Sequence, residues 1–335
     1  MDNQVKAIGV LTSGGDAPGM NAAVRAVTRA ALYKGIRVFG IRKGYRGLID
    51  RDAIELNERS VSDIIHRGGT FLYTDRCLEF KEEAGIQKGM AFCKELGIGG
   101  LVVIGGDGSF RGARDLSVRG IPCVGIPGTI DNDISSTEYT LGFDTAMNTV
   151  VEMVDRIRDT CQSHDRCSVV VVMGNGAGDI ALCTGIACGA TAVLIPEKPY
   201  DIQKDVIDRI NEVRRAGKHH FIIMVAEGIV EKKGREEKIY RFAQDLSHEI
   251  EAKTGVVTRT TVLGHVQRGG SPTLRDRVVA SQMGYHAVEL LSQGIGNRVV
   301  VMKDGRVTDF DILEALGMPK TFDEKLYEIA NTISL

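Results

Sequence analysis

The chain has 335 residues, with 42 lysines and arginines against 44 aspartates and glutamates, so its formal net charge is −2. At ~150 residues per domain, this length predicts about two domains. A chain without net positive charge lacks the electrostatic footprint of a general nucleic-acid binder. No run approaches the ~18 to 20 apolar residues of a membrane span. We therefore expect neither a nucleic acid nor a membrane as partner.

The residue counts also bear on the compartment and on the loops. The first residues resemble a strand rather than a secretory signal, and the seven cysteines form no C-x-x-C pair, so we expect reduced thiols and a cytoplasmic location. Glycine is abundant, with 40 residues against 7 prolines. Many loops are therefore expected to let the backbone approach another group closely.

Short apolar runs alternate with amphipathic segments along the chain. The runs are rich in β-branched residues and cover 7–11, 38–41, 101–104, 123–126, 169–172 and 221–225. Apolar residues at helical spacing follow at 20–31 and 150–157. Continuous apolar strands alternating with such helices predict an α/β fold with largely parallel sheets flanked by helices. Ligands of such sheets bind beyond the carboxyl ends of the strands, so the loops after these runs are candidate sites.

The most charged stretch covers residues 231–253 and carries Ile239, Phe242, Leu246 and Ile250 at helical intervals. This spacing predicts a solvated helix with one buried stripe rather than an interaction tail.

Two glycine-rich loops follow the first and third runs. The loop at 12–19 opens a helix, where free N–H groups favour a phosphate, although a merely tight turn is equally consistent with it. Its spacing matches neither G-x-G-x-x-G nor the P-loop. The loop at 105–109 surrounds Asp107 with small residues, which suits one carboxylate beside a hydrated Mg²⁺. A helix N-cap explains Asp107 equally well.

The loop at 127–133 places Asp131 and Asp133 one residue apart, with the Thr129 hydroxyl two positions before Asp131. Such a group can set a base beside an acceptor alcohol. Taken alone, a turn held by side-chain to backbone hydrogen bonds would explain it better. The predicted convergence of two Gly/Asp loops at one sheet edge favours the functional interpretation.

Three further features suit anionic ligands. The loop at 173–179 is again rich in glycine. The cluster at 264–270 combines His265 and Arg268 with glycines; His265 alone would be better explained as a structural histidine, but beside Arg268 it favours phosphate binding. Arg25 and Arg29 lie four apart on one predicted helix face, where like charges repel unless an anion neutralises them. Solvated arginines are the ordinary alternative for this pair.

These residues lie in five runs that resemble the bacterial-type ATP-dependent 6-phosphofructokinase family (phosphofructokinase A family). The runs are LTSGGDAPGMNAAVR from Leu11, RGGTFL from Arg67, VIGGDGS from Val103, PGTIDND from Pro127 and VLGHVQRGGSP from Val262. They occur in the order and spacing of that family, and the resemblance extends from Ala7 to the last predicted helix. It implies a glycolytic kinase that transfers the γ-phosphoryl group of ATP to the 1-hydroxyl of D-fructose 6-phosphate.

The resemblance also implies an architecture. Residues 1–142 and 267–317 would form a nucleotide-binding lobe, and residues 143–266 and 318–335 a sugar-phosphate-binding lobe, with the active site between them. The family assembles as a homotetramer whose active sites are shared between subunits.

Residue roles follow from the same resemblance. The nucleotide site would contain Gly15, Arg76, Cys77, Gly106, Asp107, Gly108 and Ser109. Asp107 would meet Mg²⁺, Asp131 would be the general base, and Thr129, Asp133 and Arg76 would complete the catalytic group. The sugar-phosphate site would contain Thr129, Asp131, Met173, Gly174, Asn175, Glu227, His265 and Arg268, with Arg166 and Arg259 contributed by a neighbouring subunit.

The chain departs from the family at two places. Asn175 replaces an arginine that the family associates with the transferred phosphoryl group. In the effector pocket the matching residues are Arg25, Arg29, Arg158, Gly189 and Lys218. There Glu58, Thr191 and Ala216 replace an arginine, an acid and a lysine, so we expect weakened or altered regulation.

Three other functions compete with the ATP-dependent kinase. The pyrophosphate-dependent branch carries an acid at position 108 and a lysine at 128, and both glycines here favour ATP. A non-catalytic regulatory paralogue is favoured only by Asn175, and the three aspartates Asp107, Asp131 and Asp133 argue against it. A dinucleotide-dependent oxidoreductase is the weakest alternative, because the G-x-G-x-x-G fingerprint is missing from the sequence.

Overall fold

The computed structural model describes residues 5–334, which form two compact units. Unit 1 comprises the residues up to Ile130, Ile134–Thr145 and Arg268–Lys320. Unit 2 comprises Asp131–Asp133, Ala146–Gln267 and the residues from Thr321 onward. The expected lobes divided the chain after residues 142, 266 and 317, and they included residues 1–4 and 335, which lie outside the described part.

Unit 1 contains a seven-stranded sheet in the order β11-β10-β5-β4-β1-β2-β3. Its strands are β1 (Ala7–Ser13), β2 (Arg37–Ile41), β3 (Ala53–Leu56), β4 (Leu101–Gly105), β5 (Cys123–Pro127), β10 (Arg298–Lys303) and β11 (Arg306–Asp311). The five inner strands are parallel, and only the edge strands β3 and β11 pair antiparallel. Strands β1, β4 and β5 are buried along their whole length, because helices cover both faces of the sheet.

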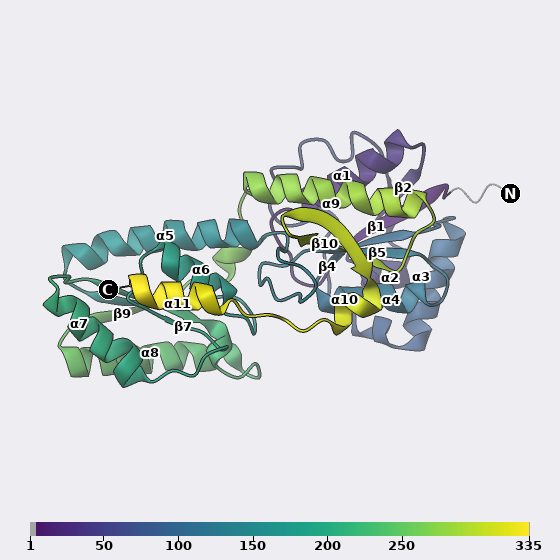
Figure 1. Cartoon of the computed structure of the whole chain (residues 1–335). Helices are drawn as coiled ribbons and strands as arrows, with labels where there is room; N and C mark the ends of the chain where they lie inside the picture. Colours follow the sequence, from purple (N-terminus) through teal and green to yellow (C-terminus); the bar gives the residue numbers. More distant parts are fainter. Residues whose placement is uncertain (1–4, 335) are drawn as a thin grey trace. The chain divides into compact units, whose positions relative to one another are not determined.

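The helices of unit 1 lie in two layers (Figure 1). They are α1 (Met20–Tyr33), α2 (Tyr45–Asp50), α3 (Glu83–Glu95), α4 (Asp107–Ser117), α9 (Leu274–Ser292) and α10 (Ile312–Gly317), with a 3₁₀ turn at Leu78–Lys81. In Figure 1, α1 and α9 pack together above the sheet, whereas α2, α3, α4 and α10 lie below it.

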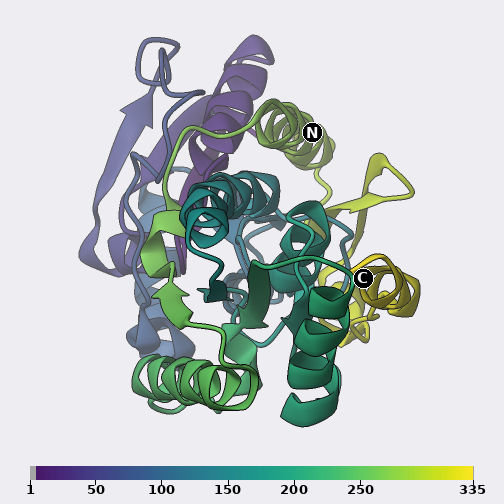
Figure 2. The same cartoon turned by 90° about the vertical axis from the view of Figure 1, so that its left-hand side faces the viewer.

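Unit 2 contains a four-stranded, fully parallel sheet in the order β7-β8-β6-β9. Its strands are β6 (Cys167–Val172), β7 (Ala192–Leu194), β8 (Phe221–Ala226) and β9 (Thr258–Val262). Its helices are α5 (Phe143–Ser163), which begins in unit 1, α6 (Asp179–Ala187), α7 (Arg209–Arg215), α8 (Arg235–Thr254) and α11 (Glu324–Ile333), with a π-helical turn at Gln203–Asp208. Figure 2 looks onto this unit and shows α5 and α8 on opposite sides of the strands.

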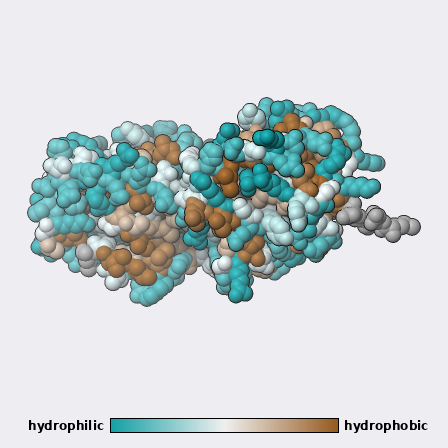
Figure 3. All heavy atoms as spheres, turned by 90° about the horizontal axis from the view of Figure 1, so that it is seen from above, coloured by the Kyte–Doolittle hydropathy of each residue, from teal (hydrophilic) through white to brown (hydrophobic). Residues whose placement is uncertain are grey.

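On the face shown in Figure 3, each unit is mainly hydrophilic with scattered hydrophobic areas. Among the described residues, no helix is both long enough and apolar enough to span a membrane. All seven cysteines are free thiols, and five of them are buried.

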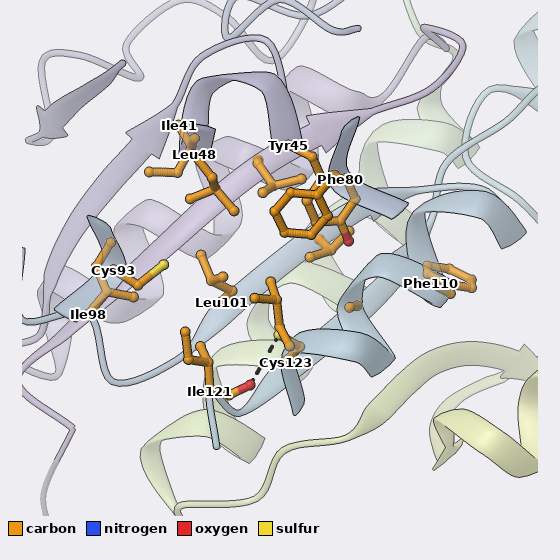
Figure 4. Close-up of a cluster of buried hydrophobic side chains, with 14 of the residues drawn as sticks. Ile41, Tyr45, Leu48, Phe80, Cys93, Ile98, Leu101, Phe110, Ile121 and Cys123 are labelled. Atoms are coloured by element: carbon orange, nitrogen blue, oxygen red, sulfur yellow. Dashed lines mark hydrogen bonds between the residues drawn. The ribbon is translucent and has the colours of Figure 1, made fainter. Parts of the chain in front are cut away.

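The core of unit 1 below the sheet is built from side chains of the strands and of the lower helices (Figure 4). Tyr45 and Phe80 stack with ring centroids 4.3 Å apart, and Leu101 and Cys123 project from neighbouring strands toward the helices. Ile41, Leu48, Leu101 and Phe110 are at most 1% exposed. Burying each such side chain contributes roughly 1.5 to 3 kcal/mol to folding.

The α/β class predicted from the sequence is confirmed, and all six apolar runs form strands. The charged stretch forms α8, but the helix begins only at Arg235 because Gly234 takes a left-handed backbone conformation with φ 69°. Strands β3, β7, β9, β10 and β11 were not predicted. Strands β3, β9 and β11 lie at sheet edges and are short or polar, so they lack a continuous apolar run. Strand β7 has only three residues. Strand β10 does carry a buried apolar run at 299–302, which is not among the six predicted runs.

Candidate active site

The first three candidate loops lie at one edge of the unit 1 sheet. Parallel pairing sets Ser13 beside Gly105, and Gly105 beside Pro127. A Cβ at Gly105 would lie 2.4 Å from the carbonyl oxygen of Ser13, so only glycine allows the strands to end this close together. The loops after β1, β4 and β5 therefore begin side by side, as the strand order predicted.

The loop after β4 leads directly into α4. Asp107 is exposed in the first turn of this helix, where the helix dipole favours an acidic side chain. A Cβ at Gly106 or Gly108 would meet no described atom within 4 Å. Ser109 is instead buried, and its hydroxyl donates to the Ser13 carbonyl at 3.1 Å. The loop thus presents Asp107 and two open glycine positions, with Ser109 fixing it to the first loop.

The segment 70–77 runs alongside the first loop. The Thr74 hydroxyl donates to the Gly14 carbonyl at 2.8 Å, and the Gly14 amide donates to the Asp75 carbonyl at 3.5 Å. These contacts bring the exposed Arg76 and the half-buried Cys77 next to the first loop, which carries Gly15.

Arg268 also approaches the first loop within unit 1. Its Nη1 lies 3.5 Å from the carbonyl oxygen of Asp16, and a Cβ at Gly15 would lie 3.0 Å from the same nitrogen. The structure therefore places this guanidinium beside Gly15, although the resemblance assigned the two residues to different ligands.

The loop after β5 is held by a short return of the chain. Gly128 bridges to Leu141, the Thr129 amide donates to the Leu141 carbonyl at 3.1 Å, and the Thr140 hydroxyl donates to the Thr129 carbonyl at 2.7 Å. Asp131 follows and is 8% exposed. The backbone at Thr129 is thus fixed from both sides immediately before Asp131.

The fourth loop, in unit 2, follows β6. The Met173 amide donates to Oε1 of Gln267 at 3.2 Å, and the Gln267 side chain donates back to the Gly264 carbonyl at 3.0 Å. Gln267 is fully buried. Gly174 has φ 142°, and a Cβ there would lie 2.5 Å from the Ala177 carbonyl oxygen, so the turn requires glycine. Sequence reasoning missed Gln267, whose only signal was its position beside His265 and Arg268.

A cavity of about 500 Å³ lies next to this loop within unit 2. Three residues expected at the sugar-phosphate site line it, namely Met173, Glu227 and His265. They come from the carboxyl ends of β6 and β8 and from the 3₁₀ turn Gly264–Arg268 after β9. The first turns of α8 supply part of the remaining wall, including Glu236 and Tyr240, and the ends of β6 and β9 supply the rest.

Asn175 is the centre of a polar group at the tip of the fourth loop. Its backbone is left-handed, with φ 56°, which asparagine tolerates better than most residues. Its amide donates to Oε1 of Glu227 at 2.9 Å, and its side chain donates to Oδ2 of Asp133 at 3.1 Å. Arg235, at the start of α8, donates to the Asn175 carbonyl at 2.5 Å. Arg235 was not predicted as a site residue, because the sequence shows it only as one charge within a charged stretch.

Arg166 and Arg259 lie at the other end of the unit 2 sheet. Arg166 immediately precedes β6, and Arg259 pairs with Ser168 near the start of that strand. Met173 follows the opposite end of β6. The structure therefore does not bring these two arginines to Met173, Glu227 and His265 of the same chain. Arg259 instead lines a second cavity of about 610 Å³, between α8 and β9.

The residues expected at an effector pocket fall into two groups. Arg158 donates to the Cys188 carbonyl next to Gly189, and burial together with the charge of Arg158 lowers the pKa of Lys218. Burial and the charges of Lys218 and Arg158 also lower the pKa of His220. These side chains form a cationic cluster in unit 2.

The other two effector candidates, Arg25 and Arg29, lie on α1 in unit 1. The pKa of Arg25 is lowered by partial burial and by the charge of Arg29. This repulsion between the two guanidinium groups is the one expected from their spacing.

Family comparison agrees with this geometry. The family model for phosphofructokinase matches residues 7–291. ATP-dependent 6-phosphofructokinase 1 of Clostridium perfringens is 53% identical over 330 residues, which cover 98% of this chain and 100% of that protein. An ATP-dependent 6-phosphofructokinase of Clostridium botulinum is 52% identical with the same coverage.

Solved structures have the same fold. A phosphofructokinase from Saccharomyces cerevisiae superposes with a TM-score of 0.83 at 32% identity, covering 98% of this chain. Pichia pastoris phosphofructokinase in the T-state gives 0.85 at 34% identity, covering 99%. This chain spans only 46% and 39% of those two fungal chains. A pyrophosphate-dependent phosphofructokinase from Marinobacter aquaeolei gives 0.82 at 21% identity, with 95% of this chain and 86% of that chain covered, and it supports the fold alone.

The fold is therefore that of the phosphofructokinases. With the family model matched over most of its length and relatives more than half identical, the chain belongs to the phosphofructokinase family.

Proposed function

We propose that this protein is an ATP-dependent 6-phosphofructokinase, which transfers the γ-phosphoryl group of ATP to the 1-hydroxyl of D-fructose 6-phosphate and releases ADP. The observation that carries the proposal is the 53% identity with a protein named ATP-dependent 6-phosphofructokinase 1, across that protein's full length. The site residues support it, because such a transfer needs alignment, cations and a base rather than covalent help from the protein.

Unit 1 would hold the nucleotide, through Gly15, Arg76, Cys77 and the loop 106–109. The open space at Gly106 and Gly108 supports this assignment, because polyphosphate oxygens can approach the backbone there. The same space favours ATP over pyrophosphate. The pyrophosphate-dependent branch carries an acid at position 108, which would occupy this space and repel a nucleotide α-phosphate.

Asp107 would hold Mg²⁺. Its carboxylate is exposed in the first turn of α4, between the two open glycines, so a hydrated ion bound to phosphate oxygens can reach it. Within residues 5–334 no three His, Cys, Asp or Glu side chains form a metal-binding group. A single carboxylate suits Mg²⁺, which keeps most of its waters. When bound, the ion neutralises charge on the β- and γ-phosphates.

Asp131 would accept the proton of the sugar 1-hydroxyl, with Thr129 and Asp133 beside it. The hydrogen bonds with Leu141 and Thr140 that fix the Thr129 backbone support this role, because a base must be held within hydrogen-bond reach of the proton it takes. The low exposure of Asp131 also protects the step from water.

Unit 2 would bind the sugar phosphate. Met173, Glu227 and His265 line a common cavity, and Gly174 and Asn175 follow Met173 in the chain. Arg268, which follows His265 in the chain and belongs to unit 1, would also bind the sugar phosphate. Arg166 and Arg259 lie at the far end of their own sheet, which supports the proposal that they serve the site of a neighbouring subunit.

A homotetramer with shared sites belongs to the same proposal. Leu274, Val278 and Tyr285 are exposed at one helical face of α9, and Tyr33 is 93% exposed at the end of α1. Figure 3 looks onto the side of unit 1 that carries these helices and shows hydrophobic areas there. Apolar groups on such a face suit contact with a second copy. The seven free thiols suit a reducing, cytoplasmic compartment.

An anionic effector would bind the cationic cluster of Arg158, Lys218 and His220 beside Gly189, with Arg25 and Arg29 completing the pocket from another subunit. Burial and then the neighbouring positive charges lower the pKa of Lys218 and of His220, and this supports an anion site because a bound anion would offset that repulsion. Thr191 is buried at the position of the family's acid. An effector bound together with Mg²⁺ would therefore lack a carboxylate that could bind the ion at position 191.

The proposal is tested by following the transferred group. Purified protein is incubated with ATP labelled in the γ-phosphoryl group and with fructose 6-phosphate. The label is expected in a sugar bisphosphate, which aldolase cleaves, and ADP should form in equal amount. Label released as inorganic phosphate, without a sugar bisphosphate, would contradict the proposal.

A further inference from the structure

Arg235 lies at the fourth loop although no sequence motif includes it. It is the first residue of α8, and its Nη1 donates to the Asn175 carbonyl at 2.5 Å and to the Asn175 side-chain oxygen at 3.3 Å. The side chain is half-buried, whereas Lys232 and Lys233 of the same charged stretch are exposed. Arg235 is therefore the cation of this stretch that the fold directs onto the loop.

The surroundings of Asn175 need a positive charge. Two carboxylates, Asp133 and Glu227, accept hydrogen bonds from the side chain and the amide of Asn175. Asn175 itself is neutral. Without Arg235, the residues in contact with Asn175 would present two negative charges and no positive charge to a phosphorylated substrate. Arg235 reduces the net charge of this group of four residues from −2 to −1.

The Arg235 guanidinium also has hydrogen-bond donors that the described contacts do not use. It carries five N–H groups in a fixed fork. Within residues 5–334, Arg235 makes hydrogen bonds only through Nη1, and Nε is buried without a partner. An unpartnered buried donor is costly and suggests a functional reason for keeping it there. Nη2 makes no hydrogen bond in the described part of the chain and is not among the buried unpartnered atoms, so it can bind an oxygen atom of a phosphoryl group while Nη1 remains on Asn175.

The position of the loop relative to the base indicates which phosphoryl group is bound. Asn175 contacts Asp133, which follows the proposed base Asp131 by two residues. The charge of Arg235 therefore acts next to the segment that carries the base. The 1-hydroxyl of the acceptor would lie at this segment, because the base must reach it. The cavity lined by Met173 and His265 lies next to the loop and would hold the rest of the acceptor.

We infer that Arg235 binds the transferred phosphoryl group and neutralises charge that develops on it, so that α8 supplies the cation which Asn175 does not. This inference rests on the proposed function and adds a catalytic residue to it. A role in the reaction predicts an effect on kcat, because a charge that acts mainly in the transition state leaves ground-state binding almost unchanged.

The test compares steady-state kinetics of four proteins with ATP and fructose 6-phosphate. Arg235→Gln keeps a donor for Asn175 but removes the charge, and it should lower kcat by about 10- to 100-fold while KM for the sugar phosphate changes by less than about 3-fold. Arg235→Lys should retain part of the activity. Arg241→Gln is the matched control, since Arg241 is exposed on the same helix and pairs with the exposed Glu237 at 3.6 Å, and its kcat and KM should equal those of the wild type.

A double variant separates the charge from a structural role. Asn175→Arg combined with Arg235→Gln returns one guanidinium to the same loop and should restore most of kcat. If Arg235 only held the loop in place, this second change would not rescue activity, and the inference would be wrong. Wild-type kcat in Arg235→Gln would also overturn it. An inactive wild type would instead refute the proposed function, and the inference would fail with it.

Discussion

The phenol of Tyr139 donates a 2.5 Å hydrogen bond to Oδ1 of Asp276, a carboxylate that is fully buried within unit 1. Asp276 also accepts the Gly142 amide at 2.8 Å and the amide and hydroxyl of Thr145. Burial raises the pKa of Asp276, and these four donors act against that rise. One carboxylate of α9 thus accepts from the Thr145 amide in the first turn of α5 and from the Gly142 amide just before that helix.

This network lies next to the hydrogen bonds that fix the Thr129 backbone. The segment that Asp276 holds includes Leu141, whose backbone bonds to Thr129 on the loop before the proposed base. We therefore expect the loss of the Asp276 hydrogen bonds to lower both the turnover and the free energy of unfolding.

Asp276→Ala should destabilise unit 1 and reduce turnover. Removing the carboxylate leaves a buried phenol and two amides without their acceptor, which costs about 3 kcal/mol of unfolding free energy. Urea unfolding followed by fluorescence measures this change. Tyr139→Phe removes only one donor and should cost about 1 kcal/mol. A loss below about 1 kcal/mol in Asp276→Ala would show that the network contributes little.

Asp131→Asn should abolish proton transfer while keeping the size of the side chain. Turnover should fall by ~10²- to 10⁴-fold, with little change in ATP affinity measured by calorimetry. Asp159→Asn changes an exposed residue of α5 and serves as the control, and it should leave both turnover and ATP affinity unchanged. Unchanged turnover in Asp131→Asn would remove this residue from the mechanism.

The sequence predicted the fold class and the four loops, because continuous apolar strands ending in glycine are unambiguous signals. Strand β9, with the sequence TRTTV, was missed because its side chains are mostly polar and partly exposed at a sheet edge. The role of Arg235 could not be predicted either. Its contact with Asn175 depends on where α8 begins, and that start is set by the left-handed Gly234 rather than by any pattern of charges.

The pair Gly108→Asp and Gly128→Lys should impair the use of ATP. An aspartate at 108 would enter the open space proposed for the nucleotide phosphates. A Cβ at position 128 would lie 3.1 Å from Ile104 and 3.2 Å from Met20, so a lysine there also requires these side chains to shift. We expect at least a 10-fold lower kcat/KM for ATP. Gly317→Ala, at the end of α10, is the control, because a Cβ there meets no described atom within 4 Å and the backbone is not left-handed; its kcat/KM for ATP should equal that of the wild type.

Sulfate should bind the cationic cluster of unit 2 more tightly as the pH falls. The pKa of His220 is lowered from 6.5 by burial and then by Lys218 and Arg158, so the free protein takes up this proton less readily than the unfolded chain. Acidification below pH ~6.5 therefore destabilises the unliganded fold, and a bound anion reverses that effect.

Thermal denaturation with and without sulfate at pH 6 and pH 8 tests this linkage. The increase in Tm should be larger at pH 6, and His220→Gln should remove the difference between the two pH values. His248→Gln, an exposed change on α8, should keep it. An equal increase at both pH values in the wild type would mean that His220 does not sense the anion.

The most direct measurement of the central claim is the initial rate of fructose 1,6-bisphosphate formation with ATP or with pyrophosphate, at equal donor concentration and with Mg²⁺ present. The glycines at 108 and 128, and the relatives named as ATP-dependent enzymes, predict a rate with ATP at least 100-fold higher than with pyrophosphate. A higher rate with pyrophosphate, or no product with either donor, would contradict the account.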